Sequence, residues 1–258
     1  MVHRLTLTAL PGIPLVEPGD DLASLTRQAL ERAGLVLEAG DVIVAAQKVV
    51  SKSEGRLVDL TTVTPSARAL EIAKQAEKDP RVIEVILGET AQVVRVRPGV
   101  VIVEHRLGFV CANAGVDHSN VRGPGSRSGE WVLLLPEDPD RSAAELRRRL
   151  RETTGLESLG VLINDSHGRA WRNGTVGIAL GAAGFPALMD LRGRPDLFER
   201  ALQVTQVGLA DEIAAAASAL MGQADEGRPI VHARGVPYPL REGSAAELLR
   251  EKSLDLFR

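Results

Sequence analysis

The sequence predicts a mixed α+β fold. Segments with the apolar spacing of helices alternate along the chain with short runs rich in Val and Ile that are typical of strands, and no long stretch lacks either kind. The 258 residues are 44% hydrophobic and 25% charged, which is ordinary for a globular protein. This length allows one large domain or two small ones.

The first half of the chain predicts two helices and three strands. Asp20 or Asp21 can cap a helix that ends at Gly34. Pro65 opens a second helix, 66–77, at the first helical position, where its missing N–H costs nothing. The expected strands are 42–46, 93–97 and 100–106, the last two joined as a hairpin.

The second half predicts three helices and two strands. Ser142 and Glu145 form a capping box for a helix that Gly155 ends. The longest helix is expected over 207–221, closed by Gly222. The other expected elements are a Gly-, Ser- and Pro-rich loop at 122–130, strands at 160–163 and 230–233, and a C-terminal helix capped by Ser244.

Composition excludes several classes of protein. The single cysteine excludes a disulfide framework and a zinc site of several thiolates, and it favours a reducing compartment. The net charge of −3 and the 3% aromatic content disfavour a basic nucleic-acid binder with a stacking platform. No targeting signal is visible, and no uncharged run reaches the ~20 residues needed to span a bilayer. We therefore expect a cytoplasmic protein that binds neither nucleic acid nor a membrane.

The usual phosphate-binding loops are absent from the sequence. It contains neither Gly-x-x-x-x-Gly-Lys-Ser/Thr nor a strand followed by Gly-x-Gly-x-x-Gly. Any nucleotide site must therefore be built in another way. For the glycine series Gly177, Gly181 and Gly184 we favour close packing against helices over contact with phosphate.

Two lysines directly after the expected strand 42–46 are the first candidate ligand-binding residues. Only five of the 31 Lys and Arg residues are Lys, and Lys48 and Lys52 lie four residues apart. They share one side of the chain whether it continues as a strand or turns helical. Two like charges on one side are costly unless an anion lies between them. From these residues alone, a solvated surface turn is an equal alternative.

Two aspartates are candidate metal ligands. Asp117 lies among small and polar residues, and carboxylates suit Mg²⁺ or Mn²⁺. Asp165 follows an expected strand and precedes the hydroxyl of Ser166, an arrangement that often holds Mg²⁺ beside phosphates. Arg169 and Arg172 come next and can clamp phosphate oxygens. A capped turn with exposed arginines is the alternative interpretation.

A polar segment, Met221 to Arg228, follows the expected long helix. By itself it predicts only a helix C-cap and a loop. Taken together, the two aspartates, the lysine pair and the arginine pair predict a metal-assisted phosphoryl-transfer site, where catalysis consists mostly of positioning and charge neutralisation.

In their order along the chain, these motifs resemble the coenzyme F420-0:L-glutamate ligase (CofE) family. The similarity extends from about residue 10 to residue 235. Three of the longer motifs are VSKSEGR at 50–56, ANAGVDHSN at 112–120 and DSHGR at 165–169. Shorter ones lie at 12–14, 19–22, 40–42, 135–140, 210–214 and 221–222.

The resemblance implies a GTP-dependent ligase that joins L-glutamate to coenzyme F420-0 through an acyl phosphate and can add further γ-linked glutamates. It also implies a two-lobed α+β fold over residues 1–240, a helical tail over 241–258 and an intertwined homodimer. The expected cofactors are Mg²⁺ or Mn²⁺, as two divalent ions, with K⁺ as a stimulant.

The resemblance also assigns roles to single residues. Asp117 and Asp165 would hold one divalent ion, and Ser166 and Gln223 the second. Lys52 and Arg169 would act in catalysis. The GTP-binding residues would be Gly12, Ile13, Pro14, Leu15, Gln47, Lys48, Lys52, Asn120, Met221, Gly222, Gln223, Ala224, Asp225, Glu226, Gly227 and Arg228.

The chain departs from the family pattern in three places. Gln223 stands where a glutamate is common, which predicts weaker binding of the second ion. Asn164 and Ser166 flank Asp165 where two threonines are frequent, and Phe198-Glu199 replaces a Tyr-Gly pair. Two alternative functions follow: a ligase on the same scaffold for another carboxylate, and a nucleotide- or coenzyme-binding module without turnover.

Overall fold

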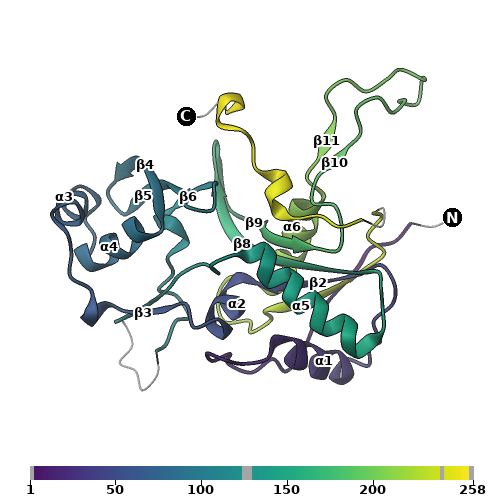
Figure 1. Ribbon diagram of the computed structural model, residues 1–258, viewed down its shortest axis with the longest axis horizontal. Helices are drawn as coiled ribbons and strands as arrows, with labels where there is room; N and C mark the ends of the chain where they lie inside the picture. Colours follow the sequence, from purple (N-terminus) through teal and green to yellow (C-terminus); the bar gives the residue numbers. More distant parts are fainter. Residues whose placement is uncertain (1–2, 124–129, 239–240, 256–258) are drawn as a thin grey trace.

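The computed structural model describes residues 3–123, 130–238 and 241–255. Its architecture is mixed α+β, which confirms the predicted class. Figure 1 shows a larger region, in which helices flank a central sheet, and beside it a smaller region of helices and short strands. Most of the predicted loop at 122–130 lies outside the described residues.

The central sheet has five strands in the order β1-β12-β2-β8-β9. Strands β2 and β8 run parallel, and all other neighbours in this sheet are antiparallel. The parallel pair places the carboxyl ends of β2 and β8 at the same edge. The strands are β1 (Thr6–Ala9), β2 (Asp41–Ala46), β8 (Leu159–Arg169), β9 (Arg172–Ala183) and β12 (Ile230–Arg234).

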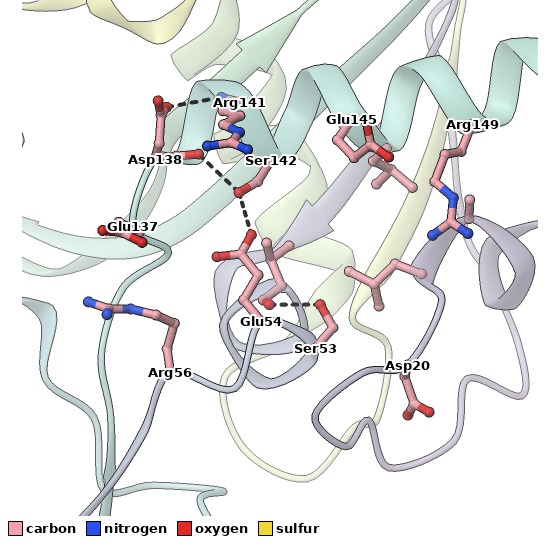
Figure 2. Close-up of a pocket in the computed structure, with 14 residues that line it drawn as sticks. Asp20, Ser53, Glu54, Arg56, Glu137, Asp138, Arg141, Ser142, Glu145 and Arg149 are labelled. Carbon is pink, nitrogen blue, oxygen red and sulfur yellow. Dashed lines mark hydrogen bonds between the residues drawn. The ribbon is translucent and has the colours of Figure 1, made fainter.

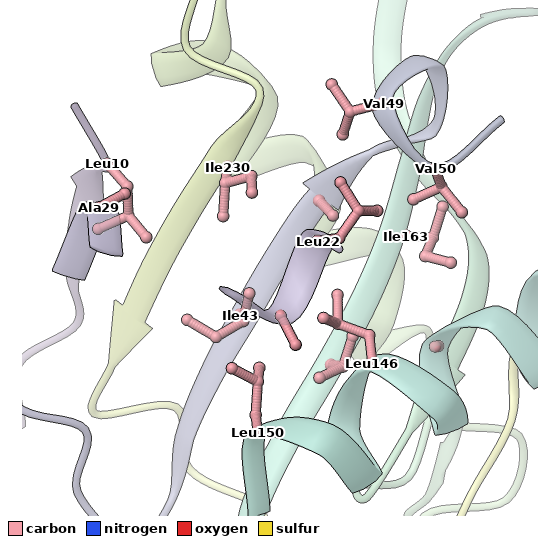
Figure 3. Packing of buried hydrophobic residues seen from close by; sticks show 14 of the residues in the cluster. Leu10, Leu22, Ala29, Ile43, Val49, Val50, Leu146, Leu150, Ile163 and Ile230 are labelled. Atoms are coloured by element: carbon pink, nitrogen blue, oxygen red, sulfur yellow. The ribbon is translucent and has the colours of Figure 1, made fainter. Parts of the chain in front are cut away.

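Helices cover both faces of this sheet. Helices α1 (Leu22–Arg32) and α5 (Pro139–Thr154) pack on the face that carries Ile43 and Ile163 (Figure 3). Helix α6 (Leu209–Met221) packs on the opposite face, which carries Val44 and Leu162. Because both faces are covered, β2 is apolar without alternation, as expected for a strand buried on both sides.

The smaller region has its own core. A three-stranded sheet of β4 (Thr90–Arg97), β5 (Val100–His105) and β6 (Val110–Ala112) packs with α3 (Ala67–Ala76) and α4 (Pro80–Gly88). The chain enters this region through β3 (Leu57–Asp59) and leaves it through β7 (Trp131–Leu133), and these two strands pair antiparallel.

A short helix and a projecting arm complete the fold. The short helix α2 (Gln47–Ser53) begins directly after β2. Lys48 and Lys52 therefore lie on a helix, and not on the continued strand that their spacing also allowed. Strands β10 (Met189–Asp190) and β11 (Gln206–Val207) form the base of an arm that projects from the body (Figure 1). Among the described residues, no helix combines the length and the apolar character needed to cross a membrane.

Several predicted boundaries were wrong. Helix α5 begins at Pro139 with Asp138 as its N-cap, so Ser142 lies inside the helix, and at 16 residues α5 is longer than α6. Ser66 caps α3, which puts Pro65 outside that helix. Within the described part of the tail, Ala245–Leu248 and Lys252–Leu254 form turns of 3-10 helix where an α-helix was expected.

The glycine series on β9 packs closely against helices, as we favoured. A Cβ on Gly177 would lie 2.5 Å from the Ala214 carbonyl oxygen of α6. A Cβ on Gly181 would lie 2.1 Å from the Pro139 carbonyl oxygen of α5. Both distances are shorter than any side-chain carbon tolerates, so glycine lets these helices approach the sheet.

Candidate active site

A cleft of about 560 Å³ lies where the parallel pairing of β2 with β8 ends, at Ala46 and Asn164. The carboxyl ends of parallel strands are a common place for ligand sites in open sheets. Five chain segments that are far apart in sequence line it: residues 13–16, 46–49 with Lys52, 120–122, 164–166, and 221–229 with Ser218.

Helix α2 supplies the two lysines. Because they are one helical turn apart, Lys48 and Lys52 both face the cleft. The Lys52 ammonium donates to the Asn120 backbone carbonyl at 2.7 Å, whereas Lys48 forms an ion pair with Asp117. Burial, and then the charge of Lys48, lower the pKa of Lys52.

The two aspartates come from different regions of the fold. Two backbone hydrogen bonds of 2.9 Å to Leu133 hold Asp117 beside β7, and its side chain reaches Lys48. Asp165 is half-buried on β8, and its Oδ1 accepts from the backbone N–H of Ser166 at 2.8 Å. Burial and the negative charge of Asp117 raise the pKa of Asp165 to about 7, although Lys48 and the Ser166 N–H oppose that rise. The two carboxylates are therefore close enough to interact.

Two buried amides at the cleft have oxygen atoms without hydrogen-bond partners. Gln47 is 1% and Asn164 4% exposed, and both line the cleft. The Gln47 amide nitrogen donates to Ser51, which leaves Oε1 unpaired, and Asn164 Oδ1 is also unpaired. Unpaired buried oxygens are uncommon and call for an explanation. Oxygen donors of this kind, carboxylate and amide, are the ligands that a hard divalent cation prefers.

The loop after α6 forms one wall of the cleft. Gly222 has a φ of +77°, and a Cβ there would lie 2.1 Å from the Glu226 carboxyl carbon, so only glycine suits this turn. Asn120 Nδ2 donates to the Ala224 carbonyl at 2.9 Å, which ties this loop to the loop that follows Asp117. Gln223 Nε2 donates to Ser218 Oγ at 3.2 Å.

The N-terminal loop forms another wall. Ile13, Pro14 and Leu15 line the cleft, while Gly12 does not. Gly12 has a φ of +71°, and its carbonyl accepts from the Arg32 guanidinium of α1 at 2.9 Å. Gly12 therefore shapes and anchors the loop that its neighbours present to the cleft.

A second cleft of about 460 Å³ lies beside the same helix α2, between α1 and α5 (Figure 2). Several of its charged groups already have partners. Arg149 pairs with Asp21 at 2.9 Å, Arg56 pairs with Glu89, and Glu54 accepts from Ser142. None of the unpaired buried polar atoms in the described residues belongs to its lining. The first cleft is therefore the candidate active site.

Comparisons with known proteins identify the family of the chain. Residues 12–235 match the family described as F420-0:Gamma-glutamyl ligase. This chain belongs to that family. It is 47% identical over 256 residues to a "Coenzyme F420:L-glutamate ligase" of Methanothermobacter thermautotrophicus, covering 98% of this chain and 99% of the relative. Relatives of the same name share 51% identity in Methanopyrus kandleri (94% of this chain, 93% of the relative) and 42% in Archaeoglobus fulgidus (99% and 97%).

In this member of the F420-0:gamma-glutamyl ligase family, the cleft gathers most of the residues predicted for the site. Three predicted residues do not line it: Gly12, which anchors a wall, Asp117, which reaches Lys48 from beside the cleft, and Arg169. Arg169 is the clear exception. Because β8 continues to Arg169 as an extended strand, its side chain lies exposed near the end of the β8–β9 hairpin, where it donates to the Gly174 carbonyl at 3.1 Å.

Three polar residues that line the cleft are not among the predicted site residues: Arg122, Asn164 and Ser218. Arg122 begins the segment predicted as a loop, and Asn164 directly precedes Asp165 in the polar segment after the predicted strand. A signal for Asn164 existed, because it is the first polar residue of a strand that is otherwise buried and apolar up to that point. Ser218 had a weaker signal, as the single hydroxyl in an Ala-rich helix.

Proposed function

We propose that this protein is a GTP-dependent ligase that joins L-glutamate to coenzyme F420-0 and releases GDP and phosphate. Membership of the F420-0:gamma-glutamyl ligase family and the names of the relatives support the two substrates. The observation that carries the proposal is the cleft itself, which Lys48, Lys52 and Asp165 line where the pairing of β2 with β8 ends, and where Lys48 pairs with Asp117.

The proposed reaction has two steps because a carboxylate is a poor electrophile. In the first, a carboxylate oxygen of F420-0 attacks the γ-phosphorus of GTP, the bond to the β–γ bridging oxygen breaks, and GDP leaves. In the second, the amine of L-glutamate attacks the acyl carbon, an amide forms, and the amine loses a proton as inorganic phosphate leaves. Repetition of both steps on the product would add further glutamates through γ-linkages.

The residues of the cleft have distinct proposed tasks. Lys48 and Lys52 would neutralise phosphate oxygens, since phosphoryl transfer depends mainly on positioning and charge stabilisation. The loops 13–15 and 221–228 would enclose the nucleotide, because both line the cleft. Asn120, tied to both Lys52 and Ala224, would hold these parts at a fixed spacing.

The donor set also supports a role for divalent ions. Asp117 and Asp165 would hold one Mg²⁺ or Mn²⁺, and Ser166 and Gln223 would contribute to a second. Bound in this way, the ions would neutralise the charge that develops on the transferred phosphoryl group. Ser166 and Gln223 both line the cleft.

A phosphate-release assay tests the proposal. We expect release from GTP only when both F420-0 and L-glutamate are present, and a product heavier than F420-0 by one or more glutamyl residues in mass spectrometry. Asp165→Asn should lose nearly all of this activity while its thermal unfolding stays close to that of the wild type. GTP-dependent phosphate release that does not require F420-0, or a product without added glutamate, would refute the assignment.

A further inference from the structure

Lys48 and Lys52 lie on the same side of α2 but have different partners. Lys52 donates to a neutral backbone carbonyl, that of Asn120. Lys48 Nζ is bound to the Asp117 carboxylate, and both side chains are half-buried. Lys48 and Asp165 line the same cleft. The Lys48 ammonium thus binds one of the two aspartates and shares the cleft with the other.

Asp117 and Asp165 are also the two carboxylates that would hold a divalent ion. An ammonium and a metal ion cannot share the same carboxylate oxygens without strong repulsion, because both are cations and the surrounding protein screens charge less than water does. The lysine side chain has four rotatable bonds and a compact charge, so it can leave the carboxylate when another anion is within reach. The phosphates of a nucleotide in the same cleft would be such an anion.

We propose that Lys48 is an internal cation that occupies the Asp117–Asp165 pair until a metal–nucleotide complex displaces it, and that it then binds the nucleotide's phosphates. Lys48 would thereby act as a positioning residue for the metal before it contacts substrate. The proposal rests on the proposed function in taking a nucleoside triphosphate as the ligand and Asp117 and Asp165 as the ligands of a divalent ion.

Two consequences follow from this exchange. A divalent ion alone should bind weakly, because it must displace Lys48 without offering it a new partner. A divalent ion that arrives with a nucleotide should bind much more tightly, because the phosphates accept the displaced ammonium. Metal and nucleotide would then strengthen each other's binding, as linkage requires.

The test measures Mn²⁺ binding to the nucleotide-free full-length protein by electron paramagnetic resonance at pH 8. Lys48→Met should bind Mn²⁺ about 10- to 100-fold more tightly than the wild type, since a charge-assisted hydrogen bond of this kind contributes roughly that factor. Lys52→Met is the matched control. It removes the same charge one helical turn away, from a lysine whose hydrogen bond goes to a neutral backbone carbonyl. We expect its Mn²⁺ affinity to stay within about threefold of the wild type.

A double variant locates the effect. Lys48→Met combined with Asp117→Asn should lose the gain in Mn²⁺ affinity, because the freed carboxylate is then absent. The affinity of Lys48→Met for GTP in the presence of Mg²⁺ should fall at the same time. Lys48→Gln, which keeps a polar side chain, should repeat both effects, and thermal unfolding verifies that each variant is folded.

The outcomes separate this inference from the proposed function. No gain in Mn²⁺ affinity in the two folded Lys48 variants, or an equal gain in Lys52→Met, overturns the internal-cation role even if wild-type ligase activity is present. A gain confined to the Lys48 variants supports the role even if the substrate proves to be a carboxylate other than F420-0.

Discussion

At the scale of single residues, the cleft divides into a charged part and a neutral part. The charged part includes Lys48, Lys52 and Asp165, with Asp117 reaching Lys48 from beside the cleft. The neutral part includes Ser218 and Gln223, whose amide nitrogen donates to the Ser218 hydroxyl. The family resemblance implies a glutamate at the position of Gln223, so the effect of a negative charge there can be tested directly.

Gln223→Glu is expected to tighten binding of the second divalent ion by about tenfold when a GTP analogue is present, because a carboxylate is a stronger ligand for a hard cation than a neutral amide. Paramagnetic resonance with Mn²⁺ gives both the number of ions bound and their affinity. Gln206→Glu makes the same change on strand β11 of the arm, outside the cleft, and should leave both values unchanged. Equal values for Gln223→Glu and the wild type would exclude Gln223 as a ligand of that ion.

At the scale of elements, ion pairs and close backbone contacts hold together the helices and strands around the cleft. Glu89, directly after α4, accepts from Arg56 at 3.1 Å and from Arg106 at 2.9 Å. Arg56 lies between α2 and β3 and also donates to the Leu135 carbonyl. This cluster joins the smaller region to the segments that carry the lysines and Asp117.

The Glu89 cluster predicts a specific pH dependence of stability. Burial alone would raise the pKa of Glu89, but the His105 imidazole 3.5 Å away and the guanidinium groups of Arg106 and Arg56 together lower it to about 2. A carboxyl group whose pKa is lowered on folding stabilises the protein above its unfolded pKa. That stabilisation is lost as pH falls from about 4.5 towards 2.

Glu89→Gln should therefore lower the free energy of unfolding by about 3 kcal/mol at pH 7. The difference from the wild type should shrink towards zero at pH 2. Urea unfolding of both proteins between pH 7 and pH 2 measures this difference. A difference that stays constant over the range would show that the charge of Glu89 does not stabilise the fold.

The contact between β9 and α6 gives the second prediction at this scale. Gly177→Ala should destabilise the fold by about 1–3 kcal/mol, because the added Cβ would meet the Ala214 carbonyl oxygen at 2.5 Å and the Ser218 Cβ at 2.6 Å. Gly168→Ala, on the partner strand β8, serves as the control, because a Cβ added to Gly168 would have no atom within 4 Å. Chemical denaturation measures the free energy of unfolding of both variants. If Gly177→Ala is as stable as the wild type, helix α6 can move away from β9 without cost.

At the scale of the whole molecule, the projecting arm is the most exposed apolar feature. Leu197 is 97%, Val204 84% and Phe198 76% exposed. Backbone hydrogen bonds such as Gly193 N to the Leu202 carbonyl at 2.8 Å hold the arm as a narrow ribbon. Such a ribbon is marginal alone, and exposed apolar groups of this kind mark interaction surfaces.

We propose that the arm contacts a second copy of this chain, in line with the homodimer that the resemblance implies. Leu197→Asp combined with Phe198→Asp should shift the mass in solution from dimer to monomer at micromolar concentration. Light scattering coupled to gel filtration measures that mass. Val36→Asp changes an exposed apolar residue on the body, 78% exposed, and should leave the mass unchanged. A wild-type protein that is monomeric at all concentrations would refute the proposal.

The sequence by itself determined the fold class, four of the six described α-helices, five of the twelve described strands and the chemical character of each polar segment, because periodicity and capping are local properties. Helix α4 and the central-sheet strands β1 and β9 have no counterpart among the predicted elements. Predicted helix boundaries were wrong where two nearby residues could each serve as the N-cap. At the start of α5, Asp138 caps the helix, and Ser142 lies inside it. Tertiary structure alone decided which polar segments meet. The parallel pairing of β2 with β8 brings α2 close to Asp165. The contact of Asp117 with β7 brings its side chain to Lys48. The continuation of β8 as a strand places Arg169 outside the cleft. Strand order and register set these distances, and they depend on packing between distant segments that no local pattern encodes.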